Sequence, residues 1–214
     1  MNPHRTRIKI CGLRDAAVAR VAAEAGADAV GIVFHPGSPR HASLEEARAV
    51  AGALPAFVQA VGLFVNAPAA QVRETLAAVP LSLLQFHGDE EPGYCGQFGL
   101  PWLKAVRVVP GTDLLECERR FSRASGLLLD AQVPGQFGGT GTPFDWSLVP
   151  PTLARPVVLS GGLDAGNVGN AIRAVRPWAV DFSSGVEAAR GVKDAALIEE
   201  FVRSVKDADA RAGG

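Results

Sequence analysis

Short apolar runs alternate with longer alanine-rich stretches along the whole chain, and this alternation limits the fold more than any other feature. Runs that stay apolar on both faces are typical of buried parallel strands. Eight such strand-then-helix units in 214 residues suit a closed barrel better than an open doubly wound sheet. The sequence therefore predicts an α/β protein with a single-domain (β/α)8 TIM barrel over residues 1–206. The predicted strands are Arg7–Cys11, Asp28–Phe34, Val58–Phe64, Leu81–Phe86, Trp102–Val108, Gly126–Asp130, Pro156–Ser160 and Ala179–Ser183.

Helical patterns follow these strands. Ser43 is a good N-cap because Glu46, three residues later, completes a capping box. The small, polar residues 207–214 are expected to fray as a C-terminal tail. The predicted helices are Asp15–Ala25, Ser43–Ala53, Ala69–Ala78, a short helix after Glu91, Asp113–Ala124, Asp145–Val149, Ala165–Val175 and Asp194–Ala210.

Charge and hydropathy narrow the possible partners. The net charge of -1 lacks the basic excess that a dedicated nucleic-acid or membrane-surface binder needs. No apolar run approaches the roughly 18 residues of a membrane-spanning helix, and the first residues lack the apolar stretch of a signal peptide. We therefore expect no nucleic acid and no membrane as partner, and a cytoplasmic location. A barrel of this size is expected to be a monomer or a homodimer.

The cysteines and histidines do not predict a metal site. An odd number of cysteines without metal-ligand spacing favours free thiols in a reducing compartment, and the cysteines are Cys11, Cys95 and Cys117. Cys95 and Cys117 fall in helical stretches, which favours a structural role. Three histidines lack carboxylate partners at metal spacing, and these are His4, His35 and His41. No metal is expected.

Polar residues gather at or just beyond the C-terminal ends of the predicted strands, where barrel enzymes carry their active sites. Strand seven ends in Ser160-Gly161-Gly162, and strand eight continues through Ser183, Ser184 and Gly185. Glycines let backbone N–H groups approach a phosphate, and a short helix opening at Ser184 would direct its positive end at the anion. These two loops predict a phosphate site, although such glycines can also merely shape turns.

Two residues at this end are candidates for proton transfer. Asp130 ends strand six, where burial should raise its pKa as a general acid requires; the alternative is a helix cap or a loop anchor. Cys11 ends strand one, and as a thiolate it could act as a base; the alternative is a buried small apolar residue. The glycine-rich loop from Ala131 to Gly141 is expected to close over a substrate, or else to be a simple connector.

Other polar residues are expected to line the same site. Lys9 should face the barrel interior as Cys11 does, and we expect it to pair there with Asp181 of strand eight. His87, after strand four, lines the site or else forms a hydrogen bond within the loop His87–Glu90. Arg40 follows two prolines in a stiff loop, and it is positioned either to bind a carboxylate or to stay solvated.

Taken together, these segments resemble the phosphoribosylanthranilate isomerase family of tryptophan biosynthesis. The resemblance spans the chain in order and spacing, with Phe86 and Ser160 standing where the family often has Leu and Ala. The matching segments are Lys9–Leu13, Ser38–Arg40, Val61–Asn66, Gln85–Glu90, Leu129–Asp130, Gly138–Gly141, Phe144–Trp146, Leu159–Leu163, Asn167–Val168 and Val180–Glu187.

The resemblance implies an isomerase that carries out an Amadori rearrangement of a phosphorylated aminoaldose to an aminoketose, without a cofactor. Asp130 would be the general acid, Cys11 the general base and Arg40 the contact for the substrate carboxylate. His87 and Asp181 would also contact the substrate. The phosphate would lie against residues of the glycine-rich loops, namely Gly139, Gly161, Gly162, Ser183, Ser184 and Gly185.

Two alternatives stay open. The analogous histidine-pathway isomerase performs the same rearrangement on a larger substrate with two phosphates, but that family has an aspartate where this chain has Cys11. A barrel that binds a phosphorylated metabolite without converting it is the second alternative. The presence of both Cys11 and Asp130 argues against it.

Overall fold

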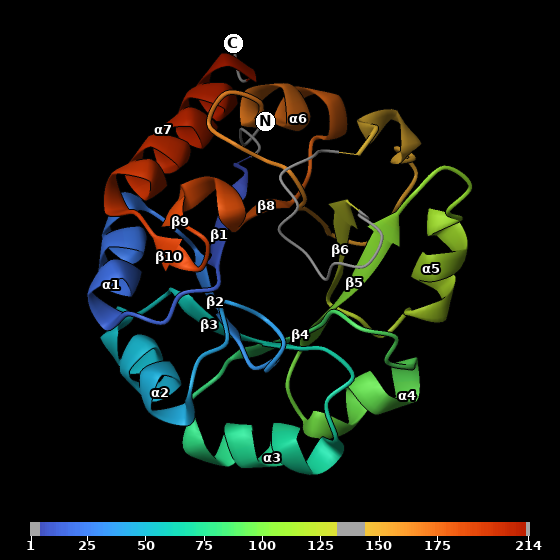
Figure 1. Cartoon of the computed structure of the whole chain (residues 1–214). Helices are drawn as coiled ribbons and strands as arrows, with labels where there is room; N and C mark the ends of the chain where they lie inside the picture. The colour runs from blue at the N-terminus through green and yellow to red at the C-terminus, as the bar shows by residue number, and fades with distance from the viewer. Residues whose placement is uncertain (1–4, 132–143, 213–214) are drawn as a thin grey trace.

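Eight parallel strands close into a barrel in which each strand pairs with the next along the chain and β8 pairs with β1. The computed structural model describes residues 5–131 and 144–212, and Figure 1 looks along the barrel with the helices around it. The predicted (β/α)8 fold is confirmed. The strands are β1 (Arg7–Cys11), β2 (Ala29–Val33), β3 (Gln59–Phe64), β4 (Leu83–Phe86), β5 (Trp102–Val108), β6 (Gly126–Ala131), β7 (Val157–Leu159) and β8 (Ala179–Phe182).

The helices pack on the outside of this barrel (Figure 1). The predicted capping box of α2 is confirmed, because Ser43 and Glu46 exchange side-chain-to-backbone hydrogen bonds. The α-helices are α1 (Ala16–Ala25), α2 (Leu44–Ala53), α3 (Ala69–Ala78), α4 (Pro92–Cys95), α5 (Leu114–Arg120), α6 (Val168–Val175) and α7 (Ala195–Ala212), and the 3-10 turns are η1 (Gly96–Phe98), η2 (Trp146–Leu148) and η3 (Ser184–Val186).

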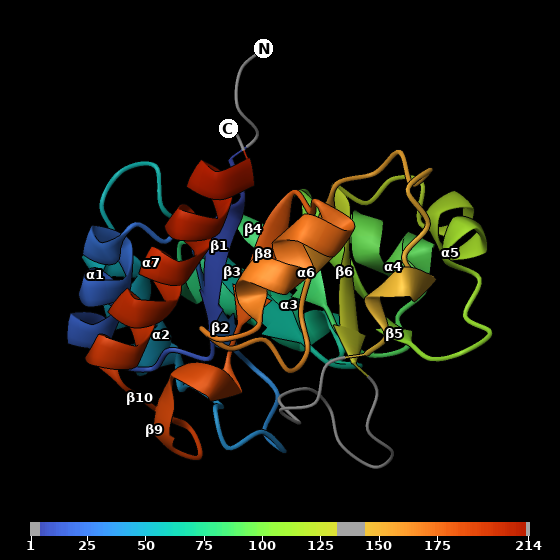
Figure 2. The ribbon, with the colours of Figure 1, turned by 90° about the horizontal axis from the view of Figure 1, so that it is seen from above.

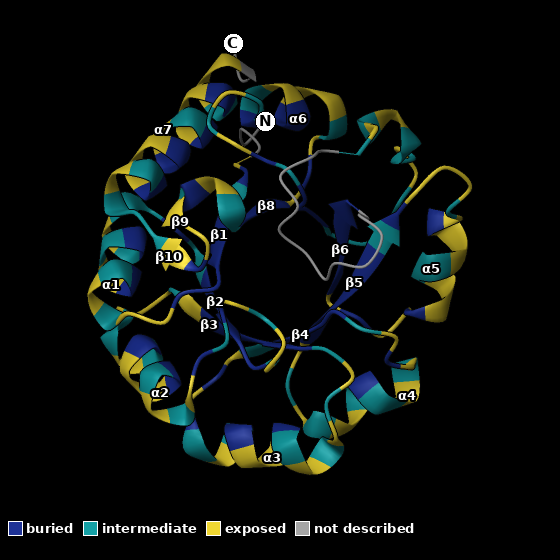
Figure 3. Ribbon diagram, in the orientation of Figure 1, coloured by how far each residue is buried: buried dark blue, intermediate teal, exposed yellow. Residues whose placement is uncertain are grey.

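The buried side chains form two layers. Most lie between the strands and the surrounding helices, while a smaller cluster that includes Leu128, Val158 and Ala179 fills the barrel interior. Figure 3 shows this arrangement, with buried strands and helices that are buried on their inner faces and exposed on their outer faces. The inner layer also holds the charged residues Lys9 and Asp181, which are 4% and 5% exposed.

The last residues described are helical. Residues 207–212, expected as a fraying tail, belong to α7, which continues to Ala212. Asp209 accepts hydrogen bonds from the backbone N and the Oγ1 of buried Thr6, both at 2.7 Å, and Ala208 is buried against the core. The polar composition of this segment hid an amphipathic last turn that ties α7 to the start of β1. Residues 213–214 lie outside the described residues.

Two short strands after β8 were not predicted. β9 (Glu187–Ala189) and β10 (Val192–Lys193) form an antiparallel hairpin. Figure 2 shows this hairpin at the same end of the barrel as the loop that follows β2. That end is the one at which all eight strands finish, so the hairpin adds side chains to the face where the polar residues gather.

Candidate active site

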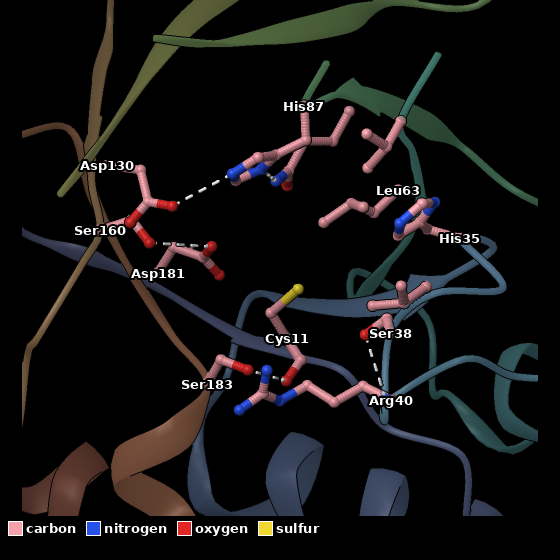
Figure 4. Close-up of a pocket in the computed structure, with 13 residues that line it drawn as sticks. Cys11, His35, Ser38, Arg40, Leu63, His87, Asp130, Ser160, Asp181 and Ser183 are labelled. Atoms are coloured by element: carbon pink, nitrogen blue, oxygen red, sulfur yellow. Dashed lines mark hydrogen bonds and ion pairs between the residues drawn. The ribbon is translucent and has the colours of Figure 1, made fainter. Parts of the chain in front are cut away.

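A pocket at the C-terminal end of the barrel collects most of the predicted site residues (Figure 4). Its polar lining comes from six different strand ends or the loops that follow them. Val33, Leu63 and Val65 supply an apolar wall on one side. The predicted residues that line this pocket are Cys11, Arg40, His87, Asp130, Asp181 and Ser183. The sequence analysis did not single out Gln85, Ser38 or His35, which also line it, and it gave Ser160 only as part of the phosphate loop.

Asp130 is joined to His87 in the lining of this pocket. Nε2 of His87 lies 3.1 Å from Oδ2 of Asp130, and the two residues are 8% and 3% exposed. The side-chain amide nitrogen of Gln85 lies 3.0 Å from Nδ1 of His87. An amide nitrogen can only donate, so Nδ1 accepts and Nε2 carries the proton that is donated to Asp130. The three side chains form a chain of hydrogen bonds that ends on the proposed acid.

His87 therefore does not form the loop hydrogen bond that was its alternative interpretation. The buried carboxylate of Glu90 stabilises that loop instead. It accepts hydrogen bonds from the backbone N of Asn66 and of Gly88, at 2.7 and 2.9 Å, and from Nζ of Lys104 at 3.0 Å. With its backbone held in this way, the loop presents the imidazole of His87 to the pocket.

Cys11 lies beside the predicted ion pair, which the structure contains. Nζ of Lys9 donates to Oδ1 of Asp181 at 2.7 Å, and both side chains are 5% exposed. Gly31, opposite Cys11 on β2, makes room for these groups, because a Cβ atom there would lie 2.7 Å from Sγ of Cys11 and 3.0 Å from Nζ of Lys9. In Figure 4 the sulfur points into the pocket, between Arg40 and the Asp130–His87 pair.

The protonation of Cys11 is set by opposing effects. Burial raises the pKa of the thiol above its ordinary value, the positive charge of Lys9 opposes this, Asp181 adds to it, and Lys193 opposes it. Burial acts to lower the pKa of Lys9, but Asp181 and Cys11 outweigh burial and hold the pKa of Lys9 above its ordinary value. Lys9 is therefore a permanent cation, while Cys11 rests as a thiol at neutral pH.

Arg40 forms a bidentate ion pair that the sequence analysis missed. Its Nε donates to Oε1 of Glu187 at 2.6 Å, and its Nη2 donates to Oε2 at 3.0 Å. Nζ of Lys193 donates to the same carboxylate at 2.7 Å, and to the backbone O of Ser183 at 2.8 Å. Glu187 belongs to the segment that carried the family resemblance, but the hairpin that brings Lys193 back to it gave no signal in the sequence.

The loops after β7 and β8 have the backbone that the phosphate prediction needs. Gly161 and Gly162 have φ values of 82° and 65°, a region that favours glycine, and a Cβ atom at Gly161 would lie 2.4 Å from the backbone N of Ala131. η3 starts at Ser184 as expected but has three residues. Lys193 also places a cation beside Ser183. Gly139 and the expected lid, apart from its first residue Ala131 in β6, fall within residues 132–143, outside the described residues.

Among residues 5–131 and 144–212, no group of three or more His, Cys, Asp or Glu side chains could hold a metal ion. Within the same part of the chain, no helix is both long and apolar enough to cross a membrane.

Comparisons with known proteins fit this geometry. A sequence profile described as N-(5'phosphoribosyl)anthranilate (PRA) isomerase matches residues 8–204. The N-(5'-phosphoribosyl)anthranilate isomerase of Thiobacillus denitrificans is 57% identical over 200 residues, which cover 94% of this chain and 98% of that protein. The crystal structure of the Thermotoga maritima isomerase is 40% identical, with a TM-score of 0.87 over 94% of this chain and 99% of that one.

A third comparison concerns a structure with a ligand. A phosphoribosyl anthranilate isomerase in complex with reduced 1-(o-carboxyphenylamino)-1-deoxyribulose 5-phosphate is 39% identical, with a TM-score of 0.83 over 94% of this chain and 99% of that one. Profile, sequence and structure agree over nearly the whole length of the chain. The chain therefore belongs to the N-(5'-phosphoribosyl)anthranilate isomerase family.

Proposed function

We propose that this protein catalyses the Amadori rearrangement of N-(5-phosphoribosyl)anthranilate to 1-(2-carboxyphenylamino)-1-deoxyribulose 5-phosphate, a step of tryptophan biosynthesis. The observation that carries the proposal is one pocket lined by a buried carboxyl, a buried thiol and an arginine, with the phosphate-type loop at its edge. The substrate has an anion at each end and reacts at the sugar between them. The arginine and the phosphate-type loop match the two anions of the substrate, and the carboxyl and the thiol match the sugar between them.

Asp130 acts as the general acid. Its protonated carboxyl gives a proton to the ring oxygen of the ribose, the bond between that oxygen and C1' breaks, and a Schiff base forms between C1' and the anthranilate nitrogen. His87 holds the Oδ2 atom of Asp130 at 3.1 Å, which fixes the direction of the carboxyl. The acid thus acts from a group that is oriented before the substrate arrives.

Cys11 acts as the general base. Its thiolate removes the proton from C2' of the Schiff base, and the electron pair of that bond moves to give an enolamine, which tautomerises to the ketone. The ammonium groups of Lys9 and Lys193 favour the thiolate electrostatically, and Lys9 is held in place by Asp181. In this proposal Asp181 contributes to substrate binding from the same wall of the pocket.

The two anions of the substrate are held at opposite sides of the reacting sugar. Arg40 binds the carboxylate of the anthranilate ring. The phosphate is bound by backbone N–H groups of Gly161, Gly162, Ser183, Ser184 and Gly185, with Gly139 contributing from the preceding loop. The reaction transfers only protons, so the chemistry requires neither a metal nor an organic cofactor.

Growth rescue tests the proposal in a cell. The gene should restore growth without tryptophan to a strain that lacks this isomerase, while Cys11→Ala and Asp130→Asn should not restore it at equal protein level. Cys95→Ala and Cys117→Ala are the matched controls and should rescue fully, because Cys95 ends α4 and Cys117 lies in α5, away from the pocket lining. Failure of the unaltered gene would leave a binding-only barrel or a histidine-pathway isomerase, and a histidine-requiring strain separates these two.

Location and assembly complete the proposal. We place the enzyme in the cytoplasm, where a reducing environment keeps the Cys11 thiol free.

The oligomeric state in this proposal is a monomer or a homodimer. The N-terminal end of the barrel is the candidate dimer interface, because Phe57 there is fully exposed and Trp178 is 45% exposed. A solution mass of twice the chain mass that falls to one chain in Phe57→Ser would assign a homodimer through this face.

A further inference from the structure

We infer that Glu187, anchored by Lys193, is a positioning residue that orients the guanidinium of Arg40 to receive the aryl carboxylate of the substrate. This inference rests on the proposed function, since it assigns how the carboxylate anchor of that function is built. The residues that carry it come from three segments: the loop after β2, the start of β9 and the end of β10.

The contact between Arg40 and Glu187 has a defined direction. Glu187 occupies the side edge of the guanidinium, because its two oxygens accept from Nε and from Nη2. A guanidinium has a second edge, formed by Nη1 and Nη2, which can bind another carboxylate side by side. Arg40 lines the pocket, and its side chain is 10% exposed. Because Glu187 occupies the edge formed by Nε and Nη2, the edge formed by Nη1 and Nη2 is the part of the guanidinium that can bind a ligand.

Glu187 is itself held in place by the hairpin. Lys193 donates to Oε1 of Glu187 at 2.7 Å, and the backbone N of Gly191 donates to Oε2 at 3.1 Å. Gly191 has a φ of 82°, and a Cβ atom there would lie 2.6 Å from the backbone O of Pro39, the residue before Arg40. The hairpin thus packs directly on the loop that carries Arg40. Backbone and carboxylate are fixed together, so little freedom is left to the guanidinium.

Arg40, Glu187 and Lys193 form a charged cluster. Within this cluster of described residues, two cations, Arg40 and Lys193, share one carboxylate, and all three side chains are at most 10% exposed. The bonds from Arg40 and Lys193 hold the pKa of Glu187 at about 2 against the effect of burial, so Glu187 stays ionised. The cluster keeps one excess positive charge in a poorly hydrated place. A carboxylate on the substrate would neutralise that charge, whereas a neutral aryl group would not.

Two ligands separate the contribution of the Arg40–carboxylate contact to binding from that of the rest of the pocket. One is the reduced product, 1-(2-carboxyphenylamino)-1-deoxyribitol 5-phosphate, and the other is the same molecule with phenylamino in place of carboxyphenylamino. The ratio of their Kd values, measured by titration calorimetry, reports the carboxylate preference alone, because sugar and phosphate are shared. The wild-type protein should favour the carboxylated ligand, and Arg40→Met should lose that preference.

Glu187→Gln is the decisive variant, since it keeps the size of the side chain. We expect its carboxylate preference to fall about tenfold, with the affinity for the phenylamino ligand unchanged and KM raised more than kcat is lowered. A purely electrostatic role predicts the opposite sign, because removing an anion beside Arg40 would strengthen carboxylate binding. Lys193→Met should weaken the preference as well, by freeing the Glu187 carboxylate and removing the excess charge.

Glu116→Gln removes an exposed ion pair with Arg119 on α5, and it controls for a general loss of charge. It should behave as wild type. An unchanged or stronger carboxylate preference in folded Glu187→Gln would overturn the positioning role, and so would an equal loss of affinity for both ligands. A wild-type protein that shows no carboxylate preference would instead contradict the anchor assigned to Arg40 in the proposed function.

Discussion

Nε2 of His87 lies 3.1 Å from Oδ2 of Asp130, and Gln85 fixes which nitrogen of the imidazole carries the proton. The donor side of the ring therefore faces the carboxyl. His87 follows β4 and Asp130 belongs to β6, on opposite sides of β5, so the strand order places both residues at the C-terminal end of the barrel. The hydrogen bond from His87 thus holds the carboxyl of Asp130, the acid of the proposed reaction, in a fixed position at the end of the barrel.

Asp130→Asn should lower kcat by about a thousandfold or more, because the amide keeps the shape of the side chain but has no acidic proton to give. Its affinity for the reduced product should stay close to that of the wild type. Stopped-flow turnover together with titration calorimetry measures both quantities. Near-normal turnover would remove Asp130 from the role of acid.

Gln85→Leu should lower kcat by about tenfold while the protein stays folded. Without the amide donor, Nδ1 of His87 is no longer held as an acceptor, and the imidazole can present an unprotonated Nε2 to Asp130. The carboxyl of Asp130 then loses the donated N–H that fixes its direction toward the ring oxygen of the substrate. Gln97→Leu, on the surface, is the control. A wild-type kcat in folded Gln85→Leu would argue against this coupling.

The rate constant kcat/KM should rise with pH above neutrality. Burial raises the pKa of Cys11, so the thiolate that removes the C2' proton is a minor species at pH 7 and becomes more abundant as the pH approaches that raised pKa. Lys9→Met removes a cation next to the thiol and should move the rising limb to higher pH. The rate of alkylation of Cys11 by iodoacetamide should follow the same pH dependence in a Cys95→Ala/Cys117→Ala background. A flat profile between pH 7 and pH 9 would contradict a thiolate base.

Gly31→Ala should damage both stability and activity. The new methyl group would lie 2.7 Å from Sγ of Cys11 and 3.0 Å from Nζ of Lys9, inside a packed barrel. Overpacking of this kind typically costs about 1–3 kcal/mol of unfolding free energy, and kcat should fall with it. Gly52→Ala in α2 is the matched control, because a Cβ atom there meets nothing within 4 Å, and it should be neutral or stabilising. Denaturant unfolding and turnover compare the two variants, and wild-type activity in Gly31→Ala would contradict the tight packing.

The sequence predicts this barrel well because its signals are local. Continuous apolar runs identify each strand, and β1 and β5 have the predicted bounds, Arg7–Cys11 and Trp102–Val108. The inward pairing of Lys9 with Asp181 follows from the two-residue period of a strand and from the closure of β8 on β1. Residues at strand ends are brought into one pocket by topology, which is why most of the predicted site residues line it.

The parts that were missed depend on contacts distant in sequence. Glu187 and Lys193 acquire a function only through a short hairpin whose strands have two and three residues, too few to show a periodic pattern. In the sequence Gln85 is a single polar residue in an apolar strand. Its hydrogen bond to His87 is evident only from the structure. The end of α7 was predicted to fray because its composition is polar, whereas the bond between Asp209 and Thr6 joins residues 203 positions apart.

A single-turnover experiment tests the central claim most directly. Purified wild-type protein, in excess over N-(5-phosphoribosyl)anthranilate, should convert it completely to the aminoketose, followed by NMR of the sugar protons. Cys11→Ala and Asp130→Asn should bind the reduced product but leave the substrate unconverted on that time scale. Wild-type protein that binds the reduced product without converting the substrate would contradict the account, and so would rapid conversion by both variants.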